Sequence, residues 1–175
     1  MDEKIDVISA AIKTLTVTSN ETVGRVAKVE ADHDALEQYT RRNNLRISGI
    51  LETANENCDQ LVVQFLENKL NITCTELDIE RTHRVGKRQD GVKRAIIVKF
   101  ASYRKRAEIF ASKKLLKKTG FLISEDLTAL RYQLYKQYCE IYAKPNVWTT
   151  DGRIHYIDKN NSHQILKPLD YIIKK

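Results

Sequence analysis

The sequence predicts an α+β fold in which a coiled-coil helix precedes two small folded domains. Three patterns support this prediction: heptad spacing in residues 1–43, alternating strand and helix signals in residues 44–124, and a helix followed by a hairpin in residues 125–175. A length of 175 residues is sufficient for this arrangement. We therefore expect an N-terminal coiled coil, a central α/β domain and a small C-terminal domain with these boundaries.

The N-terminal segment repeats at alternating spacings of three and four, the a and d positions of about five coiled-coil heptads. Most of these positions are apolar, and polar residues at Ser19, Thr22 and His33 weaken the seam. Such a narrow stripe leaves a lone helix little to bury against, so we expect the helix to associate with copies of itself. The expected oligomerisation residues are Ile5, Ile8, Ile12, Leu15, Val26, Val29 and Leu36. The alternative is a single amphipathic helix that folds back onto the next domain.

The distribution of β-branched residues within this stripe favours a trimer over a dimer. Isoleucine or valine occurs at a positions and at d positions, a mixture typical of three strands. The leucines at two d positions, Leu15 and Leu36, make this preference mild. Extended to Asn43, the helix would be roughly 60 Å long at about 1.5 Å per residue.

The central segment alternates between strand and helix signals. Apolar and polar residues alternate as in a strand, apolar residues at helical spacing form stripes, and turn residues separate the elements. We expect strands at 45–50, 77–85, 93–100 and 120–124, and helices at 61–70 and 103–116. The order β-α-β-β-α-β is the ferredoxin-like topology that RNA-recognition motifs use.

The third expected strand can be compared with the ribonucleoprotein motif of that module. Residues 93–100 agree with the eight-residue pattern at Lys93, Val98 and Phe100. Where the motif presents stacking aromatics, this chain has Ala95 and Ile97, and Arg46 replaces the usual aromatic of the first strand. We therefore expect a noncanonical RNA-recognition motif that binds phosphates and does not read a base sequence.

The C-terminal segment combines a helix with a hairpin. A helix over residues 127–141 could be capped by Ser124 or Asp126, and residues 147–157 form two β-rich runs around the turn pair Asp151–Gly152. A last short helix is expected from Asn161 or Ser162. Most of the aromatic residues here should be core, and exposed ones beside Arg131, Lys136 and Arg153 could stack bases in a groove between the two domains. These aromatics are Tyr132, Tyr135, Tyr138, Tyr142, Trp148 and Tyr156.

The charge of the chain is unevenly distributed. Residues 1–40 carry a net charge of −4, whereas residues 41–175 carry +11, and residues 81–118 contain 14 Lys and Arg against two acids. Such clustering indicates a polyanion partner, although a charge run can also be a solvated face. From the sheet and its loop we expect phosphate contacts at Arg46, Arg81, Arg84, Lys87, Arg88, Lys93, Arg94 and Lys99.

Three stretches of the chain resemble a known family. The junction Tyr39-Thr-Arg-Arg-Asn-Asn-Leu-Arg-Ile-Ser-Gly-Ile50, the stretch Arg81-Thr-His-Arg-Val-Gly86 and the strand Ala95-Ile-Ile-Val-Lys-Phe100 look like the first-open-reading-frame protein of LINE-type retrotransposons. The C-terminal third is also similar to the C-terminal domain of the baculovirus few-polyhedra (FP) protein. The resemblance covers roughly residues 5–175.

This resemblance implies a homotrimeric coiled coil, a noncanonical RNA-recognition motif and a small C-terminal domain that together coat single-stranded nucleic acid as a chaperone. Carried over by position, it implies nucleic-acid contacts at Arg81, Arg84, Arg94 and Arg131. The coiled coil is short, and no zinc knuckle or reverse transcriptase is present, so a domesticated or truncated relative is an alternative.

Several functional classes are not supported by the sequence. We find no P-loop, no nucleophile elbow, no zinc-protease motif and no set of acids for two magnesium ions, so we expect no enzyme and no cofactor. His155 and His163 lack a third ligand at zinc spacing, so we expect no metal. The three cysteines are far apart and are expected to be reduced thiols. No apolar run is long enough for a membrane span and no signal-peptide pattern is present.

These observations predict an oligomeric, sequence-tolerant protein that binds single-stranded RNA, and also single-stranded DNA, in a cytoplasmic or nuclear ribonucleoprotein. Oligomerisation would multiply a modest affinity for each domain. One alternative is a structural adaptor with protein partners, and another is binding to double-stranded DNA or chromatin.

Overall fold

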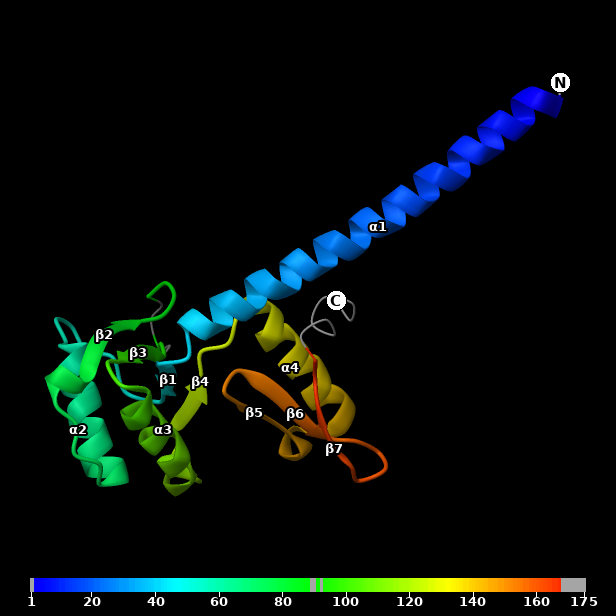
Figure 1. Cartoon of the computed structure of the whole chain (residues 1–175). Helices are drawn as coiled ribbons and strands as arrows, with labels where there is room; N and C mark the ends of the chain where they lie inside the picture. Colours follow the sequence, from blue (N-terminus) through cyan, green and yellow to red (C-terminus); the bar gives the residue numbers. More distant parts are fainter. Residues whose placement is uncertain (1, 89–90, 92, 168–175) are drawn as a thin grey trace.

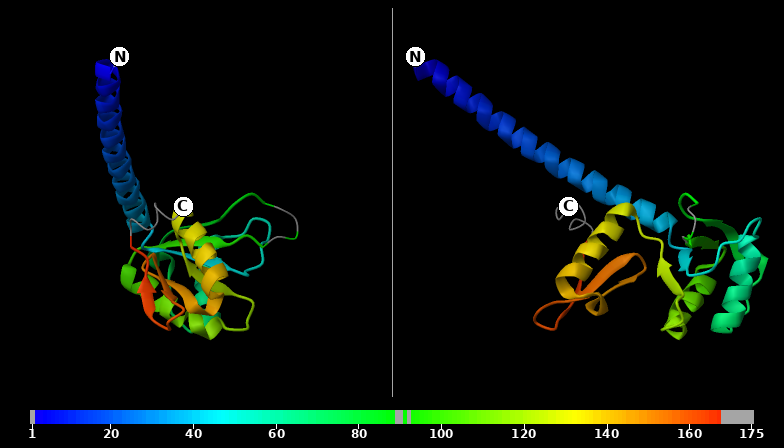
Figure 2. Two further views of the ribbon diagram at one scale, coloured as in Figure 1. Left: turned by 90° about the vertical axis from the view of Figure 1, so that its right-hand side faces the viewer. Right: turned by 180° about the vertical axis from the view of Figure 1, so that it is seen from behind.

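A computed structural model describes residues 2–88, 91 and 93–167 of the chain. It has a mixed α+β architecture in which one long helix projects from a body built on two antiparallel sheets (Figure 1). The long helix, α1 (Asp2–Thr40), contacts the body only near its C-terminal end, and its N-terminus lies far from both sheets in every view (Figure 2). No helix in the described ranges is long and apolar enough to cross a membrane.

The contact between α1 and the body uses the side of the helix that lies away from the heptad stripe. Its buried residues are Ala31, Asp34 and Gln38, which occupy b and f positions when Ile5 is an a position. The expected oligomerisation residues are all exposed, from 51% at Val26 to 69% at Leu15. The alternative in which this stripe folds back onto the next domain is therefore wrong.

The first sheet follows α1 and has four antiparallel strands in the order β2-β3-β1-β4. The strands are β1 (Asn44–Ser48), β2 (Ile79–Arg84), β3 (Ile96–Phe100) and β4 (Leu122–Glu125). Two helices, α2 (Cys58–Leu70) and α3 (Tyr103–Ser112), lie on one face of the sheet (Figure 1). The core forms between these layers and includes the fully buried side chains of Leu45, Leu66, Val98 and Ile109.

Local sequence explains where the helices of this unit begin and end. Asn57 caps α2 by accepting bonds from two backbone amides, and Asn71 ends that helix with a positive φ of 53°. Ser102 caps α3 by accepting a bond from the backbone amide of Arg104. The observed boundaries differ from the expected ones by a few residues. The largest differences are that the 3₁₀ turn Glu76–Asp78 precedes the second strand, that the third strand begins at Ile96, and that α3 ends at Ser112 and continues as the 3₁₀ turn Lys113–Leu116.

The second sheet contains β5 (Val147–Thr150), β6 (Arg153–Ile157) and β7 (His163–Ile165), and it packs against α4 (Ala129–Tyr142). The 3₁₀ turn Lys144–Asn146 joins α4 to β5. The expected hairpin is confirmed, with positive φ at both Asp151 (50°) and Gly152 (71°), as a type I′ turn requires.

Two C-terminal expectations are wrong. The cap of α4 is Thr128, whose hydroxyl accepts from the Arg131 amide, and not Ser124 or Asp126. Residues His163–Ile165, where the last helix was expected to begin, form strand β7, and the continuation of that expected helix from residue 168 lies outside the described residues. In the turn between β6 and β7, the side chain of Asp158 accepts hydrogen bonds from two backbone amides, and Asn161 has a positive φ of 58°. This turn reverses the chain, so that β7 pairs with β6.

Candidate nucleic-acid interface

A buried polar network joins α1 to the segment between the two sheets. The carboxylate of Asp126, 1% exposed, accepts hydrogen bonds from Arg41 Nη1 (3.1 Å), Asn44 Nδ2 (3.0 Å) and Arg46 Nε (2.8 Å). Gln38 donates to the Asp126 carbonyl and accepts from the Thr128 amide. This network fixes the direction in which α1 leaves the body. It also engages Nε of Arg46, one of the expected phosphate contacts.

Arg131 belongs to the same buried junction. Its Nε donates to Asp34 Oδ2 at 2.7 Å and its Nη1 donates to the Gly152 carbonyl at 2.9 Å, while its side chain is 7% exposed. Thr128 donates to the other oxygen of Asp34. Arg131 is therefore a structural residue that ties together α1, α4 and the hairpin turn, and the expectation that it contacts phosphate is corrected.

Arg84 is a second expected contact that the fold uses internally. Its guanidinium donates to both carboxylate oxygens of Glu56 and to the carbonyls of Ile50, Leu51 and Arg94. These bonds engage all three nitrogens, and the side chain is 4% exposed. The hydrogen bond from Arg84 is the main cause that lowers the pKa of the Glu56 carboxyl. Arg84 is thus a clamp on the loop after β1, not a phosphate contact.

Arg94 has a similar role but is more exposed to solvent than Arg84. It forms a bidentate pair with Glu52 at 2.9 and 2.5 Å and donates to the Gly86 carbonyl at 2.7 Å, with 19% of its side chain exposed. The hydrogen bond from Arg94 lowers the pKa of Glu52. These bonds hold the β2–β3 loop against the loop after β1, and a phosphate contact at Arg94 stays a prediction.

The remaining expected cations lie on the surface of the first sheet and its loop. Arg81 is exposed on β2 directly opposite Lys99 on β3, and Lys99 pairs with Glu80 at 2.5 Å. In the β2–β3 loop, Lys87, Arg88 and Lys93 are exposed, with Arg88 Nε 3.8 Å from Glu52. On the sheet face opposite α2 and α3, Arg46 and His83 flank Ile97, so this face lacks an aromatic at its centre.

Two basic residues of α3, Arg106 and Lys105, also form contacts within the fold. Arg106 is buried and pairs with Glu125, whose carboxylate also accepts from the Gly152 amide at 3.3 Å. Lys105 pairs with Glu108 at 3.1 Å and donates to the Thr73 carbonyl. These two side chains therefore do more than form a hydrated basic surface, because both are bonded within the fold.

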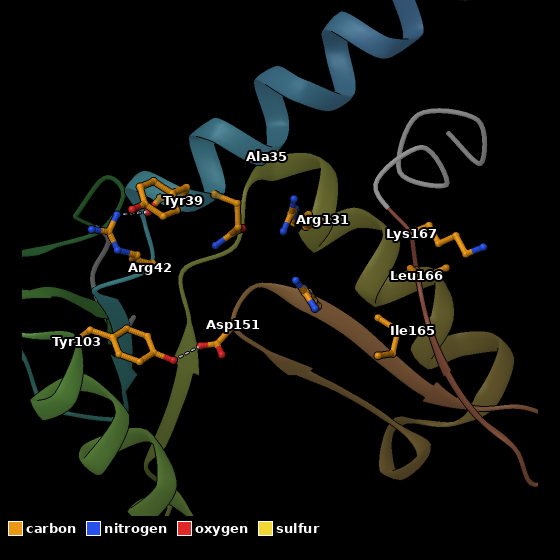
Figure 3. Close-up of a pocket in the computed structure, with 11 residues that line it drawn as sticks. Ala35, Tyr39, Arg42, Tyr103, Arg131, Asp151, Ile165, Leu166 and Lys167 are labelled. Atoms are coloured by element: carbon orange, nitrogen blue, oxygen red, sulfur yellow. Dashed lines mark hydrogen bonds between the residues drawn. The ribbon is translucent and has the colours of Figure 1, made fainter.

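A groove of about 670 Å³ lies where α1, α3 and the second sheet meet (Figure 3). Its lining includes Tyr39, Arg42, Tyr103, Asp151, Arg153, Ile165 and Lys167. The Arg42 guanidinium lies 3.9 Å from the centroid of the Tyr39 ring. The groove thus combines aromatic rings with three exposed cations and one acid, Asp151.

Tyr103 and Asp151 hold the mouth of the groove together across 48 positions of the chain. The Tyr103 hydroxyl donates to Asp151 Oδ1 at 2.7 Å, and this bond is the main cause that raises the pKa of the phenol. Arg106 Nη1 approaches the same oxygen at 3.6 Å. The single acid of the groove is therefore partly neutralised by its neighbours.

The sequence predicted a groove between the domains but assigned the wrong aromatic residues to it. Tyr138, Tyr142 and Tyr156 pack together with ring centroids 4.8–5.6 Å apart in the C-terminal core, as expected for most of the aromatics. The rings of the groove come instead from α1 and α3. The spacing of three between Tyr39, in the last turn of α1, and Arg42, in the turn that follows, was the available signal for their contact.

No family model matches the sequence, and no curated protein matches it either. Among the described residues, no cluster of three or more His, Cys, Asp and Glu side chains could hold a metal ion. The three cysteines are free thiols.

Proposed function

We propose that this chain is an oligomeric, sequence-tolerant single-stranded nucleic-acid-binding protein. The observation that carries the proposal is the groove, in which Arg42, Arg153 and Lys167 are exposed beside the rings of Tyr39 and Tyr103. Cations of this kind bind phosphates, and aromatic faces stack on any base. The combination fits a flexible single strand, whose bases are accessible, better than a duplex.

The first sheet would serve as a noncanonical RNA-recognition motif. The element order β-α-β-β-α-β, the strand order β2-β3-β1-β4 and the position of both helices on one face support a ferredoxin-like assignment. Its open face offers Arg46, Arg81 and Lys99 but has Ile97 where a stacking ring would be needed. Such a face contacts the backbone of the strand and does not read its sequence.

The long helix would assemble copies of the chain. Its heptad stripe is exposed along the whole helix, while the body is attached to the opposite b and f positions through Ala31, Asp34 and Gln38. Parallel helices can therefore pack along the stripe without displacing the body. We favour a trimer, in which three grooves act on one strand and raise the overall affinity through effective concentration.

From the resemblance of the sequence to LINE-type first-open-reading-frame proteins and to the FP protein, we also propose a ribonucleoprotein or chaperone role without catalysis. The preference for RNA over DNA rests on this resemblance, as does an intracellular, cytoplasmic or nuclear, location. The groove and the exposed heptad stripe are independent of the resemblance because they follow from the described side chains.

Filter binding would test this function with single-stranded RNA, single-stranded DNA and duplex DNA of equal length at about 50 and 200 mM salt. We expect single strands to bind best and to lose affinity steeply with salt. The variant Arg42→Ala/Arg153→Ala should bind at least about tenfold more weakly. The slope of log K against log salt concentration should become less steep by about 1.4, at about 0.7 for each lost phosphate contact. A matched control, Lys69→Ala/Lys114→Ala, removes the same charge outside the groove.

Three outcomes would reject the proposal. Salt-independent binding, or no binding to single strands, would exclude a phosphate-binding groove. Equal or tighter binding to the duplex would favour the double-stranded DNA alternative. Partners that remain bound after nuclease treatment, with unchanged capture by the groove variant, would favour the structural adaptor.

A further inference from the structure

Three flat rings gather on the second sheet, away from the tyrosine core. The rings of Trp148, His155 and His163 are nearly parallel, with interplanar angles of 12–18° and centroids 5.3–5.6 Å apart. Nδ1 of His155 and Nε2 of His163 are 3.0 Å apart, so one ring donates a hydrogen bond to the other. This bond holds the imidazoles in a common orientation and makes the cluster a preorganised surface.

The cluster lies on the sheet face that turns away from α4. Ile154 and Tyr156 on β6 belong to the core with α4, and successive side chains of a strand point to opposite faces. Trp148 is paired directly with His155, and His163 follows on β7, diagonally opposite. The three rings therefore cover the outer face of the sheet and contribute nothing to the tyrosine core.

One face of the tryptophan ring is oriented away from the histidines. Trp148 is on β5, an edge strand of the three-stranded sheet in the described part of the chain. His155 and His163 lie on the strands to one side of it, and the side chain of Trp148 is only half-buried. The Trp148 centroid lies 5.6 Å from that of His155 and 5.3 Å from that of His163, so the indole ring packs against both imidazoles, and a further flat ring can stack on its other face.

The outer face is continuous with the groove. Arg153 precedes His155 by two residues on β6, and Ile165 is paired directly with His155 on β7. Both Arg153 and Ile165 line the groove. A single strand that leaves the groove along β6 would therefore meet a cation first and then the three rings.

We propose that Trp148, supported by His155 and His163, is a stacking site for a nucleobase of a single strand that continues from the groove onto the outer face of the second sheet. The proposal rests on the proposed function and extends it, because it adds a contact outside the groove. It also explains why the C-terminal sheet carries aromatic rings on its solvent side, whereas the first sheet has Ile97 at the centre of its open face.

The experiment uses the full chain and its only tryptophan as the reporter. A uridine oligonucleotide of about 20 nucleotides with a fluorescent end label is titrated, and its anisotropy is followed in parallel with the tryptophan emission. We expect the emission to be quenched with the same midpoint as the anisotropy. Trp148→Leu should weaken binding about 5- to 100-fold, while Trp148→Phe, which keeps a ring, should remain within about threefold.

Tyr132→Leu is the matched control, because Tyr132 is an exposed aromatic on α4 that lies outside the groove and the cluster. Circular dichroism and thermal melting verify that each variant is folded. If the unaltered chain raises the anisotropy of the oligonucleotide but its tryptophan emission does not change, the stacking site is overturned and the proposed binding in the groove is not. Complete absence of binding would overturn both.

Discussion

Arg131 on α4 and Asp34 on α1 form a buried ion pair across 97 positions of the chain, with Nε and Oδ2 2.7 Å apart. Thr128 completes the hydrogen bonding of the carboxylate, and the Gly152 carbonyl accepts from the guanidinium. The Cβ that an alanine would add at Gly152 would lie 2.5 Å from Gln38 Cγ, so the hairpin turn also approaches α1 closely. The junction therefore holds the helix and both folded units in a defined arrangement.

Arg131→Ala should lower the free energy of unfolding by about 3–5 kcal/mol, because it leaves the Asp34 carboxylate buried without its charged partner. Denaturant unfolding at constant protein concentration measures this change. Arg131→Met combined with Asp34→Leu removes both charges and should recover much of the loss. Unchanged stability of Arg131→Ala together with weakened nucleic-acid binding would contradict the structural role and restore Arg131 as a contact.

Arg84→Ala should also destabilise the protein, by about 2–4 kcal/mol, since it removes the charged partner of Glu56 and the guanidinium donor to three backbone carbonyls. Arg84→Lys should recover little, because one ammonium cannot replace a fork that reaches all these acceptors. Lys87→Ala, an exposed neighbour, should change stability by less than about 0.5 kcal/mol. The same denaturation curves compare the three variants, and a wild-type midpoint for Arg84→Ala would refute the clamp.

Ile12→Asp should dissociate the expected oligomer, because it places a charge at an a position of the heptad stripe. Val17→Asp is the matched control. Val17 is at an f position of the same helix and is exposed to almost the same extent, 56% against 57% for Ile12. Sedimentation velocity over a range of concentrations measures the mass. Equal masses for both variants and the unaltered chain would exclude association through this stripe.

Acidification should destabilise the C-terminal sheet through His155. Burial, followed by the positive charges of His163 and Arg153, lowers the pKa of His155 below its ordinary value. The unfolded chain then binds more protons than the folded one, so stability falls as pH drops through about 6.5 and the loss is complete below the folded pKa. Tryptophan-monitored melting between about pH 7.5 and pH 5 measures the effect. His155→Gln should lose this part of the pH dependence, and an unchanged slope would refute the assignment.

Local patterns were sufficient for most of the elements. The heptad spacing predicted α1, the alternating residues of β1 and β3 predicted the sheet, and Asp151–Gly152 predicted the hairpin turn. They were not sufficient for β7, because its strand depends on a turn built around Asp158 and on pairing with β6. Pairing partners are distant in sequence, so a short segment by itself does not specify them.

The sequence by itself determined the α+β architecture, the uneven charge and the narrow apolar stripe of the helix, since periodicity and composition act locally. Only the tertiary structure decided which cations are available to a ligand. Arg84, Arg94, Arg106 and Arg131 look like any other basic residue in the chain, but the fold surrounds them with carboxylates and carbonyls. The groove residues Tyr39, Arg42, Tyr103 and Arg153 meet only because the polar junction brings together α1, α3 and the hairpin. Whether an arginine binds within the protein or binds a ligand depends on its neighbours in space, which residue type and spacing do not encode.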